Sequence, residues 1–228
     1  MTSSLLWRPV LLATLALLST GCAPLLLGGA VVGGGLVATD RRTAGTQLED
    51  QGIEFRASAR VRELATLGQI SVNSYNRVVL LTGEVPNATE RARVEDAVGK
   101  VENVRGVVNE LVVAGNSSLS SRSADTVLAT KVKATLVDAQ DLSSNAFRVV
   151  AERRVIYLMG RVTPREAERG AELASRVSGV ERVVKVFDLI TEAQLAAETA
   201  LLRGGSQAPA PAQAAPQAAS APAPAPSR

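Results

Sequence analysis

The sequence contains no histidine, one cysteine and few aromatic residues, which make up 3% of its 228 residues. A structural zinc site takes four Cys or His ligands, so this composition excludes one, and we expect no metal and no dissociable cofactor. A single cysteine also excludes a disulfide within the monomer. Because aromatic platforms for base stacking are missing, we expect no nucleic-acid partner.

The chain also lacks the motifs that carry catalysis. No serine lies in a Gly-x-Ser-x-Gly nucleophile motif. The run Gly33-Gly34-Gly35 lies in an apolar glycine-rich segment rather than at a strand-to-helix turn, so it is not a phosphate-binding loop. The carboxylates are scattered over helix faces. We therefore expect no catalytic residue and no enzymatic activity.

The first 22 residues have the layout of a bacterial lipoprotein signal. Arg8 precedes an apolar segment at 10–18, and small residues lead to Cys22. We interpret 1–21 as a cleaved signal peptide and Cys22 as a new N-terminus that carries a diacylglycerol and an N-acyl chain. Ala23 favours the outer membrane, by analogy with enteric bacteria. The alternatives are an ordinary signal peptide, or an uncleaved N-terminal helix, with an incidental cysteine.

Low-complexity segments flank the rest of the chain. Residues 22–49 are predicted to form a glycine-rich tether, since glycine opposes a stable helix. A glycine-zipper hairpin at 23–38 is the alternative. We expect a C-terminal helix at 191–203. The Ala-, Pro- and Gln-rich tail at 204–228 is predicted to be disordered, because it cannot bury enough apolar surface.

An internal repeat occupies the middle of the chain. Residues 78–85 are matched by 155–162, which start 77 positions later, and 104–113 are matched by 180–190, 76 positions later. Hydrophobic periodicity predicts the order helix, strand, strand, helix, strand in each copy, within domains at 50–115 and 124–190. For the first copy the predicted elements are 50–66, 69–75, 78–82, 88–101 and 104–113. For the second they are 124–139, 146–151, 155–159, 164–177 and 180–190, after a linker at 116–123.

Three further expectations follow from this repeat. Asn76-Arg77 and Glu152-Arg153-Arg154 are predicted hairpin turns. Asn103 and Gly179 occupy equivalent positions at helix ends, where a left-handed backbone is common. Copies of about 65 residues are near the lower size limit for independent folding, so we expect the two to pack together.

The repeat resembles the BON domain of bacterial envelope proteins. The resemblance rests on Gly83-Glu84-Val85 and Gly160-Arg161-Val162, together with the valine-rich stretches 104–109 and 179–184. The resemblance extends over about residues 12–190, and over this range the chain is similar to outer-membrane lipoproteins with two BON domains. It implies an α+β fold of two tandem αββαβ sandwiches, each with two helices on a small mixed three-stranded sheet.

The same resemblance implies a function. It implies an outer-membrane lipoprotein that faces the periplasm, binds anionic phospholipid through the first helix of its second domain, supports envelope integrity and localises in part to division sites. It also implies a large aromatic side chain at the position of Val127.

The residues of the predicted helix 124–139 are compatible with lipid binding. Ala129, Val132 and Leu136 share the face expected to pack on the sheet. The candidate phospholipid-binding residues on the other side are Val127, Thr130, Lys131, Lys133, Ala134 and Val137. Lysines beside a small apolar patch attract acidic headgroups. The second repeat has two more basic than acidic residues, whereas the first has one more acidic than basic residue.

Other interpretations of this helix and of the chain stay open. The helix face is a plain solvated surface in the simplest alternative. A second alternative is a protein-interaction module that docks an outer-membrane assembly or cell-envelope machine. A third alternative is a spacer lipoprotein whose Ala- and Pro-rich tail extends towards the cell wall.

Overall fold

The computed structural model describes residues 40–64 and 67–205. The expected signal peptide, Cys22, most of the expected tether and the tail from 206 onward lie outside the described residues.

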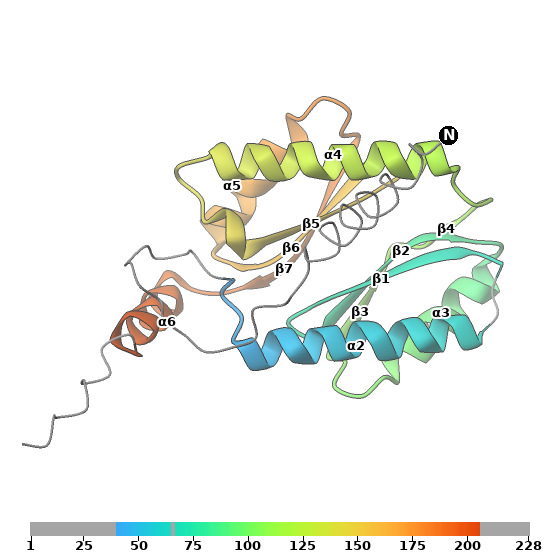
Figure 1. Ribbon diagram of the computed structural model, residues 1–228, viewed down its shortest axis with the longest axis horizontal. Helices are drawn as coiled ribbons and strands as arrows, with labels where there is room; N and C mark the ends of the chain where they lie inside the picture. The colour runs from blue at the N-terminus through green and yellow to red at the C-terminus, as the bar shows by residue number, and fades with distance from the viewer. Residues whose placement is uncertain (1–39, 65–66, 206–228) are drawn as a thin grey trace, which may run out of the picture. The chain divides into compact units, whose positions relative to one another are not determined.

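The order helix, strand, strand, helix, strand occurs twice, so the predicted α+β fold is confirmed (Figure 1). The first repeat consists of α2 (Ala44–Glu63), β1 (Gln69–Tyr75), β2 (Val78–Val85), α3 (Ala88–Gly99), β3 (Gly106–Asn109) and β4 (Val112–Val113). The second consists of α4 (Leu119–Asp138), a 3-10 turn (Ser144–Ala146), β5 (Phe147–Glu152), β6 (Val155–Val162), α5 (Pro164–Ser175) and β7 (Arg182–Leu189), and α6 (Glu192–Gly205) follows it.

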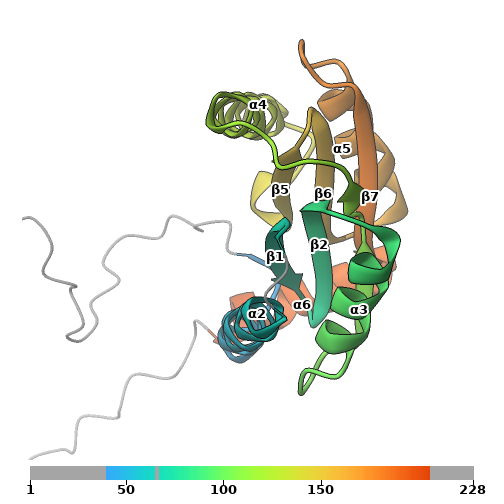
Figure 2. The same cartoon turned by 90° about the vertical axis from the view of Figure 1, so that its right-hand side faces the viewer.

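Each repeat folds its strands into a mixed sheet. In the first, β1 runs antiparallel to β2, and β2 pairs in parallel with β3 and β4. In the second, β5 runs antiparallel to β6, and β6 pairs in parallel with β7. Helices α3 and α5 supply the crossovers that parallel pairing requires. In Figure 2, α2 and α4 lie towards the β1 and β5 edges of the sheets, and α3 and α5 lie towards the opposite edges.

The two first helices begin earlier than the sequence indicated. Helix α2 starts at Ala44, where the Thr43 side chain accepts the N–H of Thr46, and α4 starts at Leu119, where Ser118 caps in the same way. Residues 44–49, expected in the tether, and 119–123, expected in the linker, are therefore helical. The apolar periodicity missed these turns because they are largely exposed, whereas the caps mark them.

The predicted strand at 104–113 is divided into β3 and β4. Gly83 lies opposite the break, and its φ of 113° is left-handed. Next to the break, the Asn109 side chain accepts the N–H of Leu111 at 3.2 Å. The equivalent Gly160 has no positive φ, and β7 runs unbroken beside it. The local backbone at one glycine thus explains why the two sheets differ.

The central strands β2 and β6 are buried on both faces. Val79 and Leu81 pack into the core beneath α2 and α3, and Ile156 and Leu158 pack into the equivalent core beneath α4 and α5. The alternate side chains, Leu80 on β2 and Tyr157 and Met159 on β6, form a third cluster with Tyr75. Burial on both faces explains the continuous apolar runs 78–81 and 155–159 at the start of these strands.

This third cluster joins the two repeats, so the expectation that they pack together is confirmed. Polar contacts surround it: Arg148 of β5 donates to Glu54 of α2 at 2.7 Å, and Asn76 donates to Asp188 at 2.6 Å. Burial raises the pKa of both tyrosines, Tyr75 and Tyr157, to about 12. The repeats therefore share a core as well as having their own.

Candidate membrane-binding site

The outward face of α4 presents five of the six candidate phospholipid-binding residues to solvent. Val127 and Val137 expose 54% and 58% of their surface, and Thr130, Lys131 and Ala134 are exposed as well. The buried residues of the opposite face include Leu128, Val132 and Leu136. A helix with one buried and one outward apolar surface is unusual for a purely solvated element.

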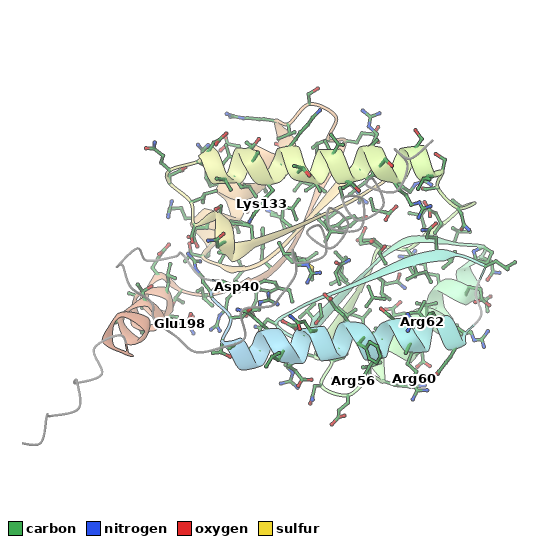
Figure 3. All side chains as sticks on the ribbon, viewed as in Figure 1. Asp40, Arg56, Arg60, Arg62, Lys133 and Glu198 are labelled. Carbon is green, nitrogen blue, oxygen red and sulfur yellow. The ribbon has the colours of Figure 1, made fainter. Side chains whose placement is uncertain are left out.

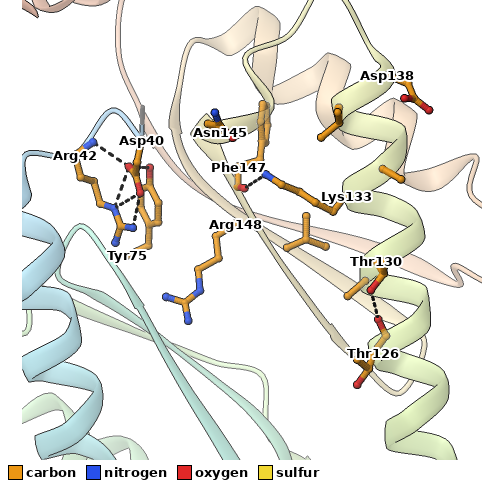
Figure 4. Close-up of a pocket in the computed structure, with 14 residues that line it drawn as sticks. Asp40, Arg42, Tyr75, Thr126, Thr130, Lys133, Asp138, Asn145, Phe147 and Arg148 are labelled. Atoms are coloured by element: carbon orange, nitrogen blue, oxygen red, sulfur yellow. Dashed lines mark hydrogen bonds and ion pairs between the residues drawn. The ribbon is translucent and has the colours of Figure 1, made fainter. Parts of the chain in front are cut away.

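Two hollows border this face. A groove of about 740 Å³ lies between α4 and β5, and Thr130, Lys133, Ala134 and Val137 line it (Figure 4). A second hollow of about 550 Å³ lies on the other flank of α4, where Val127 and Lys131 meet Arg154. The six candidates therefore form a ridge with a hollow on each side rather than the wall of one pocket.

The side chain of Lys133 is hydrogen-bonded within the protein. Its ammonium donates to the carbonyl oxygen of Ser144 at 2.6 Å and to that of Phe147 at 3.1 Å; Figure 4 shows the second bond. Burial lowers its pKa. These bonds join α4 to the start of β5, so Lys133 has a structural role and has less capacity to bind a headgroup than its spacing on the helix suggested.

Lys131 is different from its neighbour. It is exposed, and its side-chain ammonium forms no hydrogen bond or ion pair with any residue in the described part of the chain. The guanidinium of Arg154, across the second hollow, contacts the Gly179 carbonyl at 3.2 Å and Glu181 at 3.0 Å. The positive charge of Lys131 is thus available to an anion, beside the apolar surface of Val127.

The cations of the larger groove have partners. Arg148 donates to Glu54, to the Ser74 carbonyl and to Asn73, at 2.7 to 3.1 Å. On the opposite wall Arg42 lies 4.0 Å above the Tyr75 ring. Arg42 also pairs with Asp40 and Asp50. The lining of the groove is therefore largely apolar, and its two arginines already have partners within the protein.

Sequence reasoning missed two buried carboxylates. Asp50 of α2 accepts the backbone N–H groups of Asn76 and Arg77, both at 2.8 Å. Asp125 of α4 accepts those of Arg153 and Arg154, both at 2.9 Å. The two aspartates are 75 positions apart, close to the repeat spacing, and that equivalence was the signal that could have identified them.

A second feature that the sequence concealed is the docking of the segment before α2. Arg41 forms two bonds of 2.7 Å to the carboxylate of Glu166 in α5. Burial alone would raise the pKa of Glu166, but these bonds and the N–H of Thr163 hold the pKa below its usual value. Arg41 lay in the region expected to be a tether, whereas here it attaches the chain to the second repeat.

No helix within residues 40–64 and 67–205 is both long enough and apolar enough to cross a membrane.

Known proteins share this architecture. Residues 50–115 and 124–191 each match the family model of the BON domain. The chain is 35% identical over 190 residues to the outer membrane lipoprotein DolP of Haemophilus influenzae, a match that covers 82% of this chain and 98% of that protein. It is 29% identical to the 21 kDa hemolysin of Actinobacillus pleuropneumoniae, over 66% of this chain and 79% of that protein. A solved C-terminal domain of CdsD, a structural protein of the type III secretion system of Chlamydia trachomatis, is 10% identical over 60% of this chain and 96% of its own, with a TM-score of 0.27, too remote to inform function.

Proposed function

The chain belongs to the BON-domain family, and from that premise we propose that it is a periplasm-facing lipoprotein of the outer membrane. In this proposal Cys22 carries the lipid anchor, and α4 binds anionic phospholipid as a second contact. The protein supports envelope integrity, in part at division sites, and catalyses no reaction. The similarity to an outer membrane lipoprotein over nearly its whole length supports the location.

One observation carries the lipid-binding part of the proposal. Lys131 offers an unpaired charge directly beside the exposed side chains of Val127 and Ala134 on the outward face of α4. A basic residue near an anionic surface contributes about 1 kcal/mol, and a partly buried aliphatic side chain adds to it. An aliphatic ridge with one free lysine is a weak binder alone. Its binding is measurable at high lipid concentration, and the lipid anchor strengthens it by holding the ridge close to the membrane.

Vesicle co-sedimentation tests this proposal. Residues 38–228, which contain both repeats and lack the anchor, are mixed with neutral vesicles and with vesicles rich in phosphatidylglycerol. We expect binding to the anionic vesicles only, and about a tenfold loss on Lys131→Glu, because the change removes one attraction and adds one repulsion. Lys100→Glu at the C-terminal cap of α3 is the control, since it makes the same charge change at an exposed site and should retain most of the binding.

Equal and negligible binding to both kinds of vesicle would contradict the proposal. The exposed valines of α4 would then favour the docking of an envelope protein. The anchor is tested separately by the intact mass of protein extracted from membranes: cleavage before Cys22 and three acyl chains are expected, and a mass without acyl groups would refute it.

A further inference from the structure

We propose that α2 of the first repeat is a second membrane-binding helix, and that it contacts an anionic lipid surface through Leu48, Phe55 and Arg62. We call these three residues the α2 stripe. The inference rests on the proposed lipid-binding function and adds a contact in the repeat whose charge balance had pointed away from lipid.

The α2 stripe is an outward apolar face on a helix that already has a buried one. Leu48 and Phe55 expose 68% and 73% of their surface. They are seven residues apart, so they point in nearly the same direction, and Arg62 continues the same line. The buried side of α2 consists of Ile53, Ala57 and Val61, with Asp50. The stripe is therefore not part of the core.

Phe55 is the one aromatic residue exposed to solvent in the described part of the chain. The others there, Tyr75, Phe147, Tyr157 and Phe187, are buried or half-buried. An exposed phenylalanine beside basic residues is one feature of helices that lie in the headgroup layer. In α4 the outward apolar residues are only aliphatic, so the aromatic contribution of this protein would come from α2.

The charges of α2 favour an anionic surface once their partners are counted. Each carboxylate of the helix forms an ion pair with an arginine: Glu49 with Arg56, Asp50 with Arg42, Glu54 with Arg148 and Glu63 with Arg60. Arg42 is shared with Asp40, so one negative charge stays at the buried side of α2, away from the stripe. Arg62 forms no ion pair or side-chain hydrogen bond with the described residues. In Figure 3 it lies on the other side of α2 from Arg56 and Arg60. One guanidinium without a partner among the described residues thus lies on the same face as Phe55, two helical turns away.

The positions of α2 and α4 allow one surface to contact both. Each packs on the outer antiparallel strand of its sheet, α2 on β1 and α4 on β5, and both lie on the same side of the sheets in Figure 2. Arg148 of β5, which lines the larger groove beside α4, connects β5 to α2 through Glu54. Two weak contacts on one rigid body bind more tightly than either alone.

A tryptophan reporter tests the inference. The single tryptophan of the chain is Trp7, so Phe55→Trp in residues 38–228 introduces the sole indole. We expect its emission to shift to the blue and to be quenched by brominated lipids in phosphatidylglycerol-rich vesicles, but not in neutral ones. We also expect Phe55→Ser and Arg62→Glu to weaken vesicle binding, each by about fivefold. Leu189→Ser, at an exposed position of β7, is the matched control, and thermal melts establish that each variant is folded.

The outcomes separate this inference from the proposed function. If the protein binds anionic vesicles and Lys131→Glu abolishes binding, while the indole of the Phe55→Trp variant stays unquenched and Phe55→Ser binds normally, the role of α2 is refuted and that of α4 stands. If the unaltered residues 38–228 bind no vesicles, both are refuted. Quenching of the introduced indole together with weaker binding of the α2 variants supports the inference.

Discussion

At the scale of single residues, Asp50 and Asp125 set the shape of both repeats. Each accepts two backbone N–H groups from a hairpin turn. In the second repeat that turn is Arg153-Arg154, with φ values of 51° and 61°. Such turns favour Asn-Gly because the left-handed region is costly for residues with a Cβ. The buried carboxylate therefore compensates for a turn sequence that is unfavourable by itself.

Asp125→Asn tests this role. An amide retains one acceptor oxygen but presents an NH₂ group to the second backbone donor, so a buried bond to a charged group is lost. We expect the free energy of unfolding to fall by about 2 kcal/mol, measured by urea denaturation. Asp138→Asn at the exposed end of α4 is the control and should change it by less than about 0.5 kcal/mol. Similar effects for the two variants would contradict the role.

Glu152 makes stability depend on pH. Burial, and then the carboxylates of Glu84 and Asp125, raise its pKa from 4.5 to about 6 against the opposing charges of Arg153 and Arg122. The folded protein then binds the proton more tightly than the unfolded chain. Its stability therefore falls as the pH rises from 4.5 through 6.

Replacing Glu152 by Gln removes the charge that causes this penalty. We expect Glu152→Gln to raise the melting temperature above pH 6, where wild-type Glu152 is ionised. Below about pH 4.5, where both side chains are neutral, we expect no difference. Thermal melts at pH 4 and pH 7.5 provide the comparison. A gain of the same size at both pH values would show that the ionisation of Glu152 is not the cause.

At the scale of elements, the hairpin of each repeat requires a glycine for close approach of the backbone. A Cβ built on Gly160 would lie 2.3 Å from the Ala146 carbonyl oxygen. We expect Gly160→Ala to destabilise the protein by about 2 kcal/mol, since β6 and the 3-10 turn before β5 must move apart. Gly106 in β3 has open space around the same position, so Gly106→Ala is the matched control and should be nearly neutral. Denaturation of the two variants side by side gives the answer, and equal losses would rule out the steric cause.

The element order could be predicted from the sequence because periodicity reports burial. The first halves of the central strands, 78–81 and 155–159, are apolar at every position. The boundaries of other elements were harder to predict from the sequence. The break between β3 and β4 depends on one left-handed glycine in the adjacent strand, and the first turns of α2 and α4 depend on caps at Thr43 and Ser118.

The candidate site was predictable only in outline. The spacing of Val127, Lys131 and Ala134 gives a common face, which the structure shows to be exposed. The sequence spacing alone does not reveal that Lys133 donates to the Ser144 carbonyl, because that contact depends on where β5 begins. Phe55 was not distinguished by the pattern because a single apolar residue on a helix surface is ordinary. Only the structure, which shows the ion pairs of the surrounding charged residues, indicates that Phe55 could contact a membrane.

At the scale of the whole molecule, the two repeats behave as one unit through the cluster of Tyr75, Leu80, Tyr157 and Met159. We expect Met159→Asp to expose backbone amides of α2 and β2, although Met159 belongs to the other repeat, because the shared core is lost. Hydrogen exchange read by mass spectrometry measures this. Faster exchange confined to the second repeat would mean that the repeats are energetically independent.

Lipid binding through α4 is the central claim, and paramagnetic relaxation tests it most directly. Residues 38–228 are bound to phosphatidylglycerol nanodiscs that contain a spin-labelled headgroup, and amide broadening is recorded along the chain. We expect the strongest broadening at Val127, Lys131 and Ala134, and little along α3 and α5. Broadening centred on α3 or α5, with α4 unaffected, would contradict the account.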